Sequence, residues 1–232
     1  KAAWDWARHW LGDAEMPASW TAAKQAATKP AKAPTSGAGR TVELSEAELA
    51  AKVAEIVRQT EVPNGTPAHA YLVGRGIAIQ PPDCIRFRRN AYGSYGAMVA
   101  LATDAAGEVL AIQQVYLTAE GKKAPVNPVK RTNKAVKGWG ERSAVRLPGR
   151  EPVVLCEGVE TALSVWQATG QEVWACLGVS NIGRAPVPEK ATVIIARDGD
   201  APGSKAEGMI TRAATALALR GLTVMIATPP ED

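Results

Sequence analysis

The sequence of 232 residues contains few aromatic residues, two histidines and three cysteines. Aromatic side chains make up 5% of it, and seven of the twelve are tryptophan. Cys84, Cys156 and Cys176 are far apart, and together with His9 and His69 they show no zinc-ligand spacing. We therefore predict free, buried thiols rather than disulfides, and a reducing cytoplasm as the compartment.

Long apolar runs and the common nucleotide-binding motifs are also missing. No stretch approaches the roughly 20 apolar residues of a membrane span, and no secretory signal is visible. There is no Walker A motif and no dinucleotide fingerprint. Ser180 has no His or Asp at a spacing typical of a catalytic triad. These absences argue against a membrane protein, a P-loop NTPase and a serine hydrolase. The hydrophobic content of 46% is typical of a folded chain with a real core.

The formal net charge of +4 is unevenly distributed along the chain. Residues 1–40 carry a net charge of +3, and residues 41–83 carry −3. Residues 84–150 carry +8, whereas residues 151–232 carry −4. A basic middle followed by an acidic end is expected if one region binds a phosphate backbone and the next holds metal ions.

The N-terminal part of the sequence predicts little packed structure. A short helix is expected over residues 1–12. Residues 13–40 are rich in Ala, Lys, Pro, Ser and Gly, so we expect a linker there, with a loosely packed arm as the alternative. Because the chain begins at Lys1 rather than at Met, we expect it to be part of a longer protein.

The middle of the chain predicts two helices and then strands. A helix is expected over residues 45–59, where a serine and a glutamate three residues apart form a capping box. A shorter helix is expected over residues 67–73. Alternating apolar residues then predict a β-hairpin with strands at 97–102 and 109–117, and a short strand at 144–147.

The last third of the chain alternates between strand and helix patterns. The expected strands are 153–156, 172–176, 192–196 and 222–227, and the expected helices are 160–169 and 204–220. Strands that alternate with helices indicate a mostly parallel sheet. The predicted fold class is therefore α/β, with an α+β N-terminal subdomain followed by a mostly parallel sheet.

Three carboxylates follow two of these apolar strands. Glu157 comes directly after one strand, and Asp198 and Asp200 come after another. Open α/β sheets bind ligands beyond the carboxyl ends of their strands, and clustered carboxylates suit a hard cation such as Mg²⁺. The alternatives are a glutamate favoured by the dipole at a helix N-terminus, and an ordinary Asp/Gly surface turn.

A basic stretch precedes this acidic region. Residues 121–150 contain nine Lys/Arg and one acidic residue, which favours a phosphate-binding face over a solvated loop. The candidate nucleic-acid or nucleotide contacts are Lys123, Lys130, Arg131, Lys134, Lys137, Arg142 and Arg146.

These residues resemble a known family. The segments 155–158 and 196–200 resemble the Toprim domain, which bacterial-type primases share with topoisomerases and some nucleases. The resemblance implies that Glu157, Asp198 and Asp200 are catalytic and hold Mg²⁺ or Mn²⁺.

The preceding segments narrow the resemblance to DNA primases. Residues 71–77 resemble the "YL-x-x-RG" segment of the replicative primase core, and the hairpin is similar to a strand pair of its basic subdomain. Residues 124–128 followed by Lys137 resemble its template-binding motif. The resemblance covers roughly residues 67–228, and it is strongest to the shorter primases and primase-helicases of phages, plasmids and mobile elements.

This resemblance implies a catalytic core that synthesises RNA primers on single-stranded DNA from ribonucleoside triphosphates. A helicase module in the same or another chain is an expected partner. The expected domains are an N-terminal helix and linker (1–40), a basic nucleic-acid-binding subdomain (41–150) and a Toprim domain (151–232) that is truncated at its C-terminus.

The sequence departs from the family pattern at one position near the acids. The family often has an Asp four residues after its Glu, whereas this chain has Thr161 there and Glu160 one position earlier. Two alternatives stay open: a Toprim-type nuclease or topoisomerase-like fragment, and a non-catalytic nucleic-acid-binding module, which predicts no metal dependence.

Overall fold

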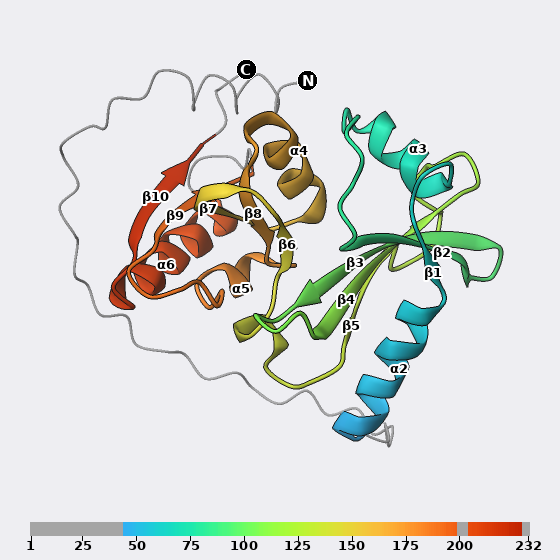
Figure 1. Ribbon diagram of the computed structural model, residues 1–232, viewed down its shortest axis with the longest axis horizontal. Coiled ribbons are helices and arrows are strands. Elements are labelled where there is room, and N and C mark those ends of the chain that lie inside the picture. The colour runs from blue at the N-terminus through green and yellow to red at the C-terminus, as the bar shows by residue number, and fades with distance from the viewer. Residues whose placement is uncertain (1–43, 199–203, 229–232) are drawn as a thin grey trace.

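Two β-sheets form the frame of the molecule, which is a computed structural model that describes residues 44–198 and 204–228. An antiparallel sheet comes first in the chain and a mostly parallel sheet follows (Figure 1). The predicted α/β class is confirmed. The helix and linker predicted over residues 1–40 lie outside the described residues.

The first helices form where the sequence signals place them. Helix α2 (Glu46–Arg58) begins after Ser45, whose hydroxyl accepts a hydrogen bond from the Glu48 N–H. The Glu48 carboxylate accepts one from the Ser45 N–H, so the predicted capping box is confirmed. Helix α3 (Pro67–Gly74) begins after Thr66, whose hydroxyl accepts a hydrogen bond from the N–H of Ala68.

The first sheet has the order β1-β2-β3-β4-β5, with every neighbouring pair antiparallel. Its strands are β1 (Thr60–Glu61), β2 (Ile85–Tyr92), β3 (Tyr95–Thr103), β4 (Val109–Leu117) and β5 (Lys130–Lys134). Strands β3 and β4 confirm the predicted hairpin. Strand β5 was not predicted, because its sequence has no apolar alternation.

The two faces of the first sheet are covered by different helices (Figure 1). Val53 and Ile56 of α2 pack against Val99 and Ile112, on what we call the α2 side. Helix α3 packs against the opposite face, which includes Met98, Ala100 and Val115 and which we call the α3 side. Successive side chains of a strand point to opposite faces, so register assigns each residue to one side.

The second sheet has the order β10-β9-β7-β8-β6. Its strands are β6 (Val145–Leu147), β7 (Arg150–Cys156), β8 (Gln171–Ala175), β9 (Thr192–Ala196) and β10 (Thr223–Ala227). The remaining elements are η1 (Trp139–Glu141), α4 (Val159–Thr169), α5 (Val179–Ile182) and α6 (Lys205–Leu219). Strand β6 is antiparallel to β8, and the other neighbours are parallel, which confirms the predicted sheet.

Helices α4 and α6 cover opposite faces of the second sheet. Cys156 and Ile194 belong to the core that includes α4 and the α3 side of the first sheet. Leu155 and Ile195 belong to the core that includes α6. Within the part of the chain that the structure describes, no helix is long and apolar enough to cross a membrane.

Helix α4 is tied to the segment that follows α3. The Gln167 side-chain oxygen accepts hydrogen bonds from the N–H groups of Ala78 (2.7 Å) and Ile79 (3.1 Å). Its Nε2 donates to the carbonyl of Gly76 at 3.0 Å. One side chain therefore makes three hydrogen bonds across the junction of the two sheets.

We predict that Gln167→Ala lowers the free energy of unfolding by about 2–3 kcal/mol, because each lost hydrogen bond costs roughly 1 kcal/mol. Urea denaturation followed by circular dichroism measures this change. Gln80→Ala, at an exposed glutamine just beyond the same segment, is the control and should stay within about 0.5 kcal/mol of wild type. Equal effects of the two changes would show that the Gln167 hydrogen bonds do not stabilise the junction of the sheets.

All three cysteines are free, which confirms the prediction from the sequence. Burial raises the pKa of the Cys84 and Cys176 thiols to about 12. Burial is also the main cause that raises the pKa of Cys156. The folded chain therefore keeps these thiols protonated at a pH where an unfolded chain, with an ordinary thiol pKa of about 8.5, would ionise them.

A thiol pKa that is higher in the folded chain means that unfolding releases a proton at alkaline pH, so stability falls as pH rises above about 8.5. Cys176 alone should remove about 2 kcal/mol between pH 7.5 and 10. Urea denaturation of wild type and Cys176→Ala at both values measures this difference. A stability gap between the two proteins that does not change with pH would contradict the prediction.

Candidate metal centre

Three parallel strands of the second sheet end in one row. Cys156 at the end of β7 has Ala175 of β8 and Ala196 of β9 as its cross-strand partners. The residues that follow β7 and β9, including Glu157 and Asp198, therefore lie at the same edge of the sheet. This arrangement places two of the predicted carboxylates beyond the carboxyl ends of neighbouring strands.

The two residues after β9, Arg197 and Asp198, point to opposite faces of the sheet and contact different helices. Arg197 turns to the α6 face, where its guanidinium lies 3.2 Å from Oε1 of Glu207. Asp198 turns to the α4 face, where its Oδ1 accepts a hydrogen bond from the Thr161 hydroxyl at 2.9 Å. Thr161, at the position where an Asp was expected, thus supplies a donor rather than a fourth negative charge.

Glu157 occupies the turn between β7 and α4. Its side chain is half-buried, and its carbonyl accepts a hydrogen bond from the Gly178 N–H at 3.1 Å. Asp200 lies outside the described residues, so its predicted role remains a prediction. Within residues 44–198 and 204–228, no three His, Cys, Asp or Glu side chains lie close enough together to hold a metal ion. Two carboxylates at one edge of the sheet have the donor chemistry for Mg²⁺, which proteins commonly hold with one or two carboxylates, water and phosphate oxygens.

Tyr71 of α3 contacts the first turn of α4. The Tyr71 hydroxyl donates a hydrogen bond to Oε1 of Glu160 at 2.8 Å. Burial is the main cause that raises the pKa of Tyr71, and the charge of Glu160 adds to it. The tyrosine therefore remains a proton donor at neutral pH, and it fixes a carboxylate three residues after Glu157.

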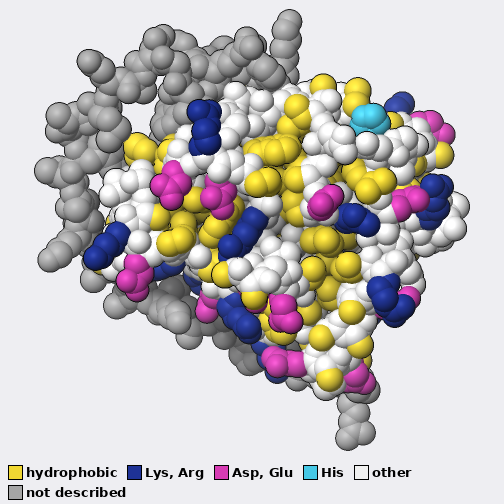
Figure 2. Space-filling model, in the orientation of Figure 1, with side chains coloured by type: hydrophobic (Ala, Val, Ile, Leu, Met, Phe, Trp, Pro, Cys, Tyr) yellow, Lys and Arg dark blue, Asp and Glu magenta, His cyan; other side chains and the backbone are white. Residues whose placement is uncertain are grey.

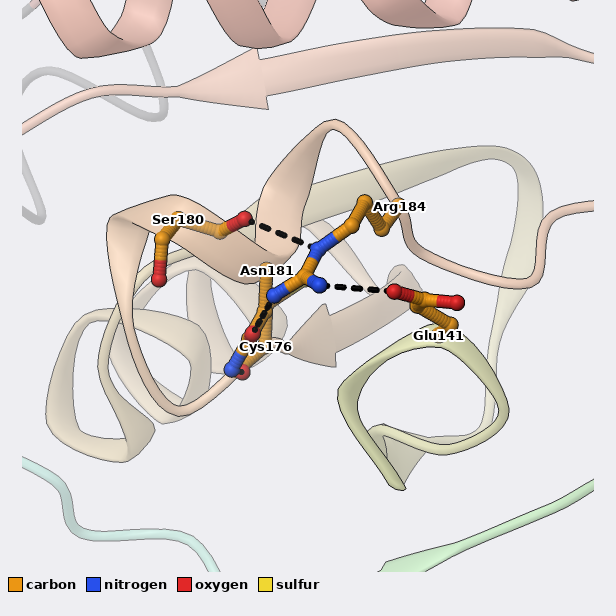
Figure 3. A network of polar contacts seen from close by, with 5 residues as sticks. All are labelled: Glu141, Cys176, Ser180, Asn181 and Arg184. Carbon is orange, nitrogen blue, oxygen red and sulfur yellow. Dashed lines mark hydrogen bonds and ion pairs between the residues drawn. The ribbon is translucent and has the colours of Figure 1, made fainter. Parts of the chain in front are cut away.

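The loop after β8 is held by a polar network (Figure 3). The Asn181 side chain donates to the carbonyl of Cys176 at 2.9 Å and accepts from Arg184 at 3.0 Å. The Arg184 guanidinium also lies 2.7 Å from the Glu141 carboxylate and donates to the carbonyl of Ser180. This network joins the short helix η1 to the edge of the second sheet where the strands end.

The backbone of the same loop is strained. Leu177 has a φ of +56°, a left-handed conformation that costs a residue with a side chain roughly 1–2 kcal/mol. Leu177 immediately precedes Gly178, which donates to the Glu157 carbonyl. Strained backbone of this kind concentrates at functional sites.

The basic residues of β5 divide between the two faces of the first sheet. Lys130 and Lys134 pair with Val115 and Ala111, so they lie on the α3 side. Arg131 pairs with Gln114, whose partner in β3 lies on the α2 side. All three side chains are exposed.

The other predicted basic residues lie at separate places. Lys123 forms a bridge with Leu117, at the end of β4 that points away from the second sheet. Lys137 and Arg142 flank η1, near the junction of the sheets. On the face seen in Figure 2, basic side chains are interspersed with acidic ones rather than gathered in one patch.

Arg146 is placed apart from the others. Its guanidinium carbon lies 4.2 Å from the ring centroid of Trp174, which belongs to the core on the α6 face. Burial is the main cause that lowers the pKa of Arg146. Stacking on a tryptophan is a sufficient structural reason for an arginine at this position.

Comparison with known families finds a match for the last third of the chain. Residues 152–232 match the family model described as a Toprim domain. The chain contains a Toprim domain. Within it, Glu157 follows β7 and Asp198 follows β9, as the resemblance implied. Residues 47–143 match a model described as a domain of unknown function (DUF7146).

Similarity to a solved structure is weak. A solved structure, described as the primase fragment of the bacteriophage T7 primase-helicase protein, matches with 15% identity and a TM-score of 0.44. The match covers 63% of this chain and 58% of that chain, so this chain corresponds to little more than half of that fragment. No curated protein matches this chain.

We predict that Thr161→Val weakens Mn²⁺ binding to the Toprim domain about tenfold, because outer contacts of metal ligands typically contribute 10- to 100-fold in affinity. Calorimetric titration measures it. Thr161→Ser keeps the hydroxyl and should restore most of the affinity. Thr215→Val, on the exposed part of α6, is the control. Unchanged affinity in Thr161→Val would exclude this role for the hydroxyl.

Proposed function

We propose that the chain is the catalytic core of a DNA primase, which joins ribonucleotides on a single-stranded DNA template. The main support is the match of residues 152–232 to the Toprim domain, in which Glu157 and Asp198 follow neighbouring strands. An antiparallel sheet with a basic edge strand lies next to it. The primase-like segment at 71–77 supports this proposal, because Tyr71 contacts Glu160 beside the acids.

The acidic residues would hold the metal ions that the reaction needs. Glu157, Asp198 and Asp200 would bind Mg²⁺ or Mn²⁺, which when bound would neutralise the triphosphate and favour ionisation of the attacking 3′-hydroxyl. Thr161 would keep Asp198 in one orientation by its hydrogen bond. Tyr71 would restrain Glu160, so that its negative charge stays at the first turn of α4.

The basic residues would hold the phosphates of template and nucleotide. Lys134 lies at the end of β5 nearest the second sheet, and Lys137 and Arg142 follow close to the junction. Lys130 and Lys123 lie progressively farther along the sheet and would contact the outgoing template. Each neutralised phosphate releases counterions, so binding should weaken steeply with salt. A helicase module in the same or another chain would deliver the template.

We predict that the chain makes short RNA products on mixed-sequence single-stranded DNA with labelled ribonucleotides and Mg²⁺ or Mn²⁺. Asp198→Asn should reduce synthesis at least about 100-fold, because a lost metal ligand removes several kcal/mol of transition-state stabilisation. Gel electrophoresis of the labelled products measures synthesis. Asp83→Asn, an exposed acid that flanks β2, is the matched control and should retain synthesis.

Two results would contradict the proposal. Metal-dependent cleavage of the DNA without synthesis would identify a Toprim-type nuclease. Binding of DNA that needs no metal and is unchanged by Asp198→Asn, with neither synthesis nor cleavage, would identify a non-catalytic binding module.

A further inference from the structure

Three of the four tyrosines of the chain gather on one face of the first sheet. Tyr116 belongs to the core on the α2 side. Tyr92 and Tyr95 are cross-strand partners at the β2–β3 turn, and the Tyr92 ring lies 5.4 Å from the Tyr116 ring at an interplanar angle of 45°. All three rings therefore lie on the α2 side.

Exposure separates Tyr92 from the other two rings. Tyr116 is 5% exposed and Tyr95 is half-buried, so packing accounts for both. Tyr92 is 55% exposed, although its ring rests on Tyr116. The Tyr92 ring packs on Tyr116 on one side and is open to solvent on the other. It therefore presents a flat aromatic surface at little cost in conformational entropy. Such surfaces stack on the bases of single-stranded nucleic acids.

Basic residues lie on the same side around these rings. Arg88 pairs with Ala97, which in turn pairs with Tyr116. The Arg88 guanidinium is held by the side-chain oxygens of Gln59 (2.9 Å) and Gln114 (3.5 Å). Arg131 pairs with Gln114, one row farther along the sheet. Two fixed rows of the sheet therefore carry an arginine beside the tyrosines.

A lysine completes the surface at the turn. Lys123 bridges Leu117 at the end of β4, and Ala124, the next residue, belongs to the core on the α2 side. Lys122 precedes this bridge and is exposed. The Lys122 N–H donates to the Thr118 hydroxyl at 3.3 Å, which fixes the backbone there. Two acids lie nearby: Glu120 in the same turn, and Glu55, whose carboxylate accepts a hydrogen bond from the Gln59 side chain. The three cations Lys122, Arg88 and Arg131 outnumber them.

We propose that this surface, defined by Tyr92, Tyr95, Tyr116, Arg88, Lys122 and Arg131 and called the tyrosine face, is a second contact site for single-stranded nucleic acid. One base stacks on Tyr92, and the neighbouring phosphates lie against the three cations. The aromatic platform and the positive charge together match a single-stranded polyanion rather than a peptide or a duplex.

The tyrosine face is distant from the acids of the Toprim domain. Tyr116 lies near one end of β4, whereas Thr103 at the other end of this hairpin bridges Ala144, next to β6 (Figure 1). The seven steps along β4 from Val109 to Tyr116 span about 24 Å at roughly 3.4 Å per residue. The site is thus separate from the metal centre, and it does not depend on catalysis.

The test is fluorescence anisotropy with labelled oligothymidylate of about 20 nucleotides, in EDTA so that no metal chemistry contributes. Tyr92→Ala should weaken binding roughly 5- to 50-fold, and Tyr92→Phe should restore it because stacking needs the ring and not the hydroxyl. Val62→Ala removes an equally exposed side chain (56%) without a ring, and it should leave binding unchanged.

Two further readouts keep the proposal independent of folding defects and of the proposed activity. Arg131→Gln should reduce the slope of log Kd against log salt by about one. Photo-crosslinking to an oligonucleotide that contains bromodeoxyuridine should label the peptide that contains Tyr92, in wild type and in Asp198→Asn alike. A protein that makes no primers but shows these effects would refute the primase proposal and leave this one intact.

Equal affinity of wild type, Tyr92→Ala and Arg131→Gln, or crosslinks that map only to the α3 side, would overturn the proposal. So would a Tyr92→Ala protein that binds oligothymidylate normally but loses self-association in sedimentation velocity. That result would make the tyrosine face an interface between copies of the chain.

Discussion

The in-register ending of three parallel strands is the constraint on which the candidate site depends. Cys156 pairs with both Ala175 and Ala196, so the chain leaves the sheet at one level on β7, β8 and β9. Glu157 and Asp198 follow two of these strands, so they lie at the same edge of the sheet without long loops. Arg197 and Asp198 then face opposite helices, and the Thr161 hydroxyl provides a neutral donor beside Asp198.

Helix α4 brings the two sheets together at that level. Its first turn contacts Asp198 through Thr161 and Tyr71 of α3 through Glu160, and Gln167 two turns later binds the segment after α3. The network around Arg184 makes a second connection on the other side of the strand ends. A change in the packing of the first sheet against α4 would therefore shift the side chains beside Glu157.

Apolar runs bounded by turn residues made β9 and the β3–β4 hairpin predictable, and the capping box did the same for α2. Strand β5 was not predictable, since its polar sequence becomes a strand only because β4 offers it a partner. Glu157 and Asp198 were placed by strand ends alone. The Thr161–Asp198 and Tyr71–Glu160 contacts join residues 37 and 89 positions apart, and only packing brings them together.

Strand β5 carries cations on both of its faces, although it is the edge strand of the sheet. Lys130 and Lys134 belong to one face and Arg131 to the other, so neighbouring positions act on different surfaces. An insertion or deletion of one residue ahead of β5 would exchange the two sets while the net charge stayed the same. Two homologues with identical composition here could thus present their cations to opposite sides of the sheet.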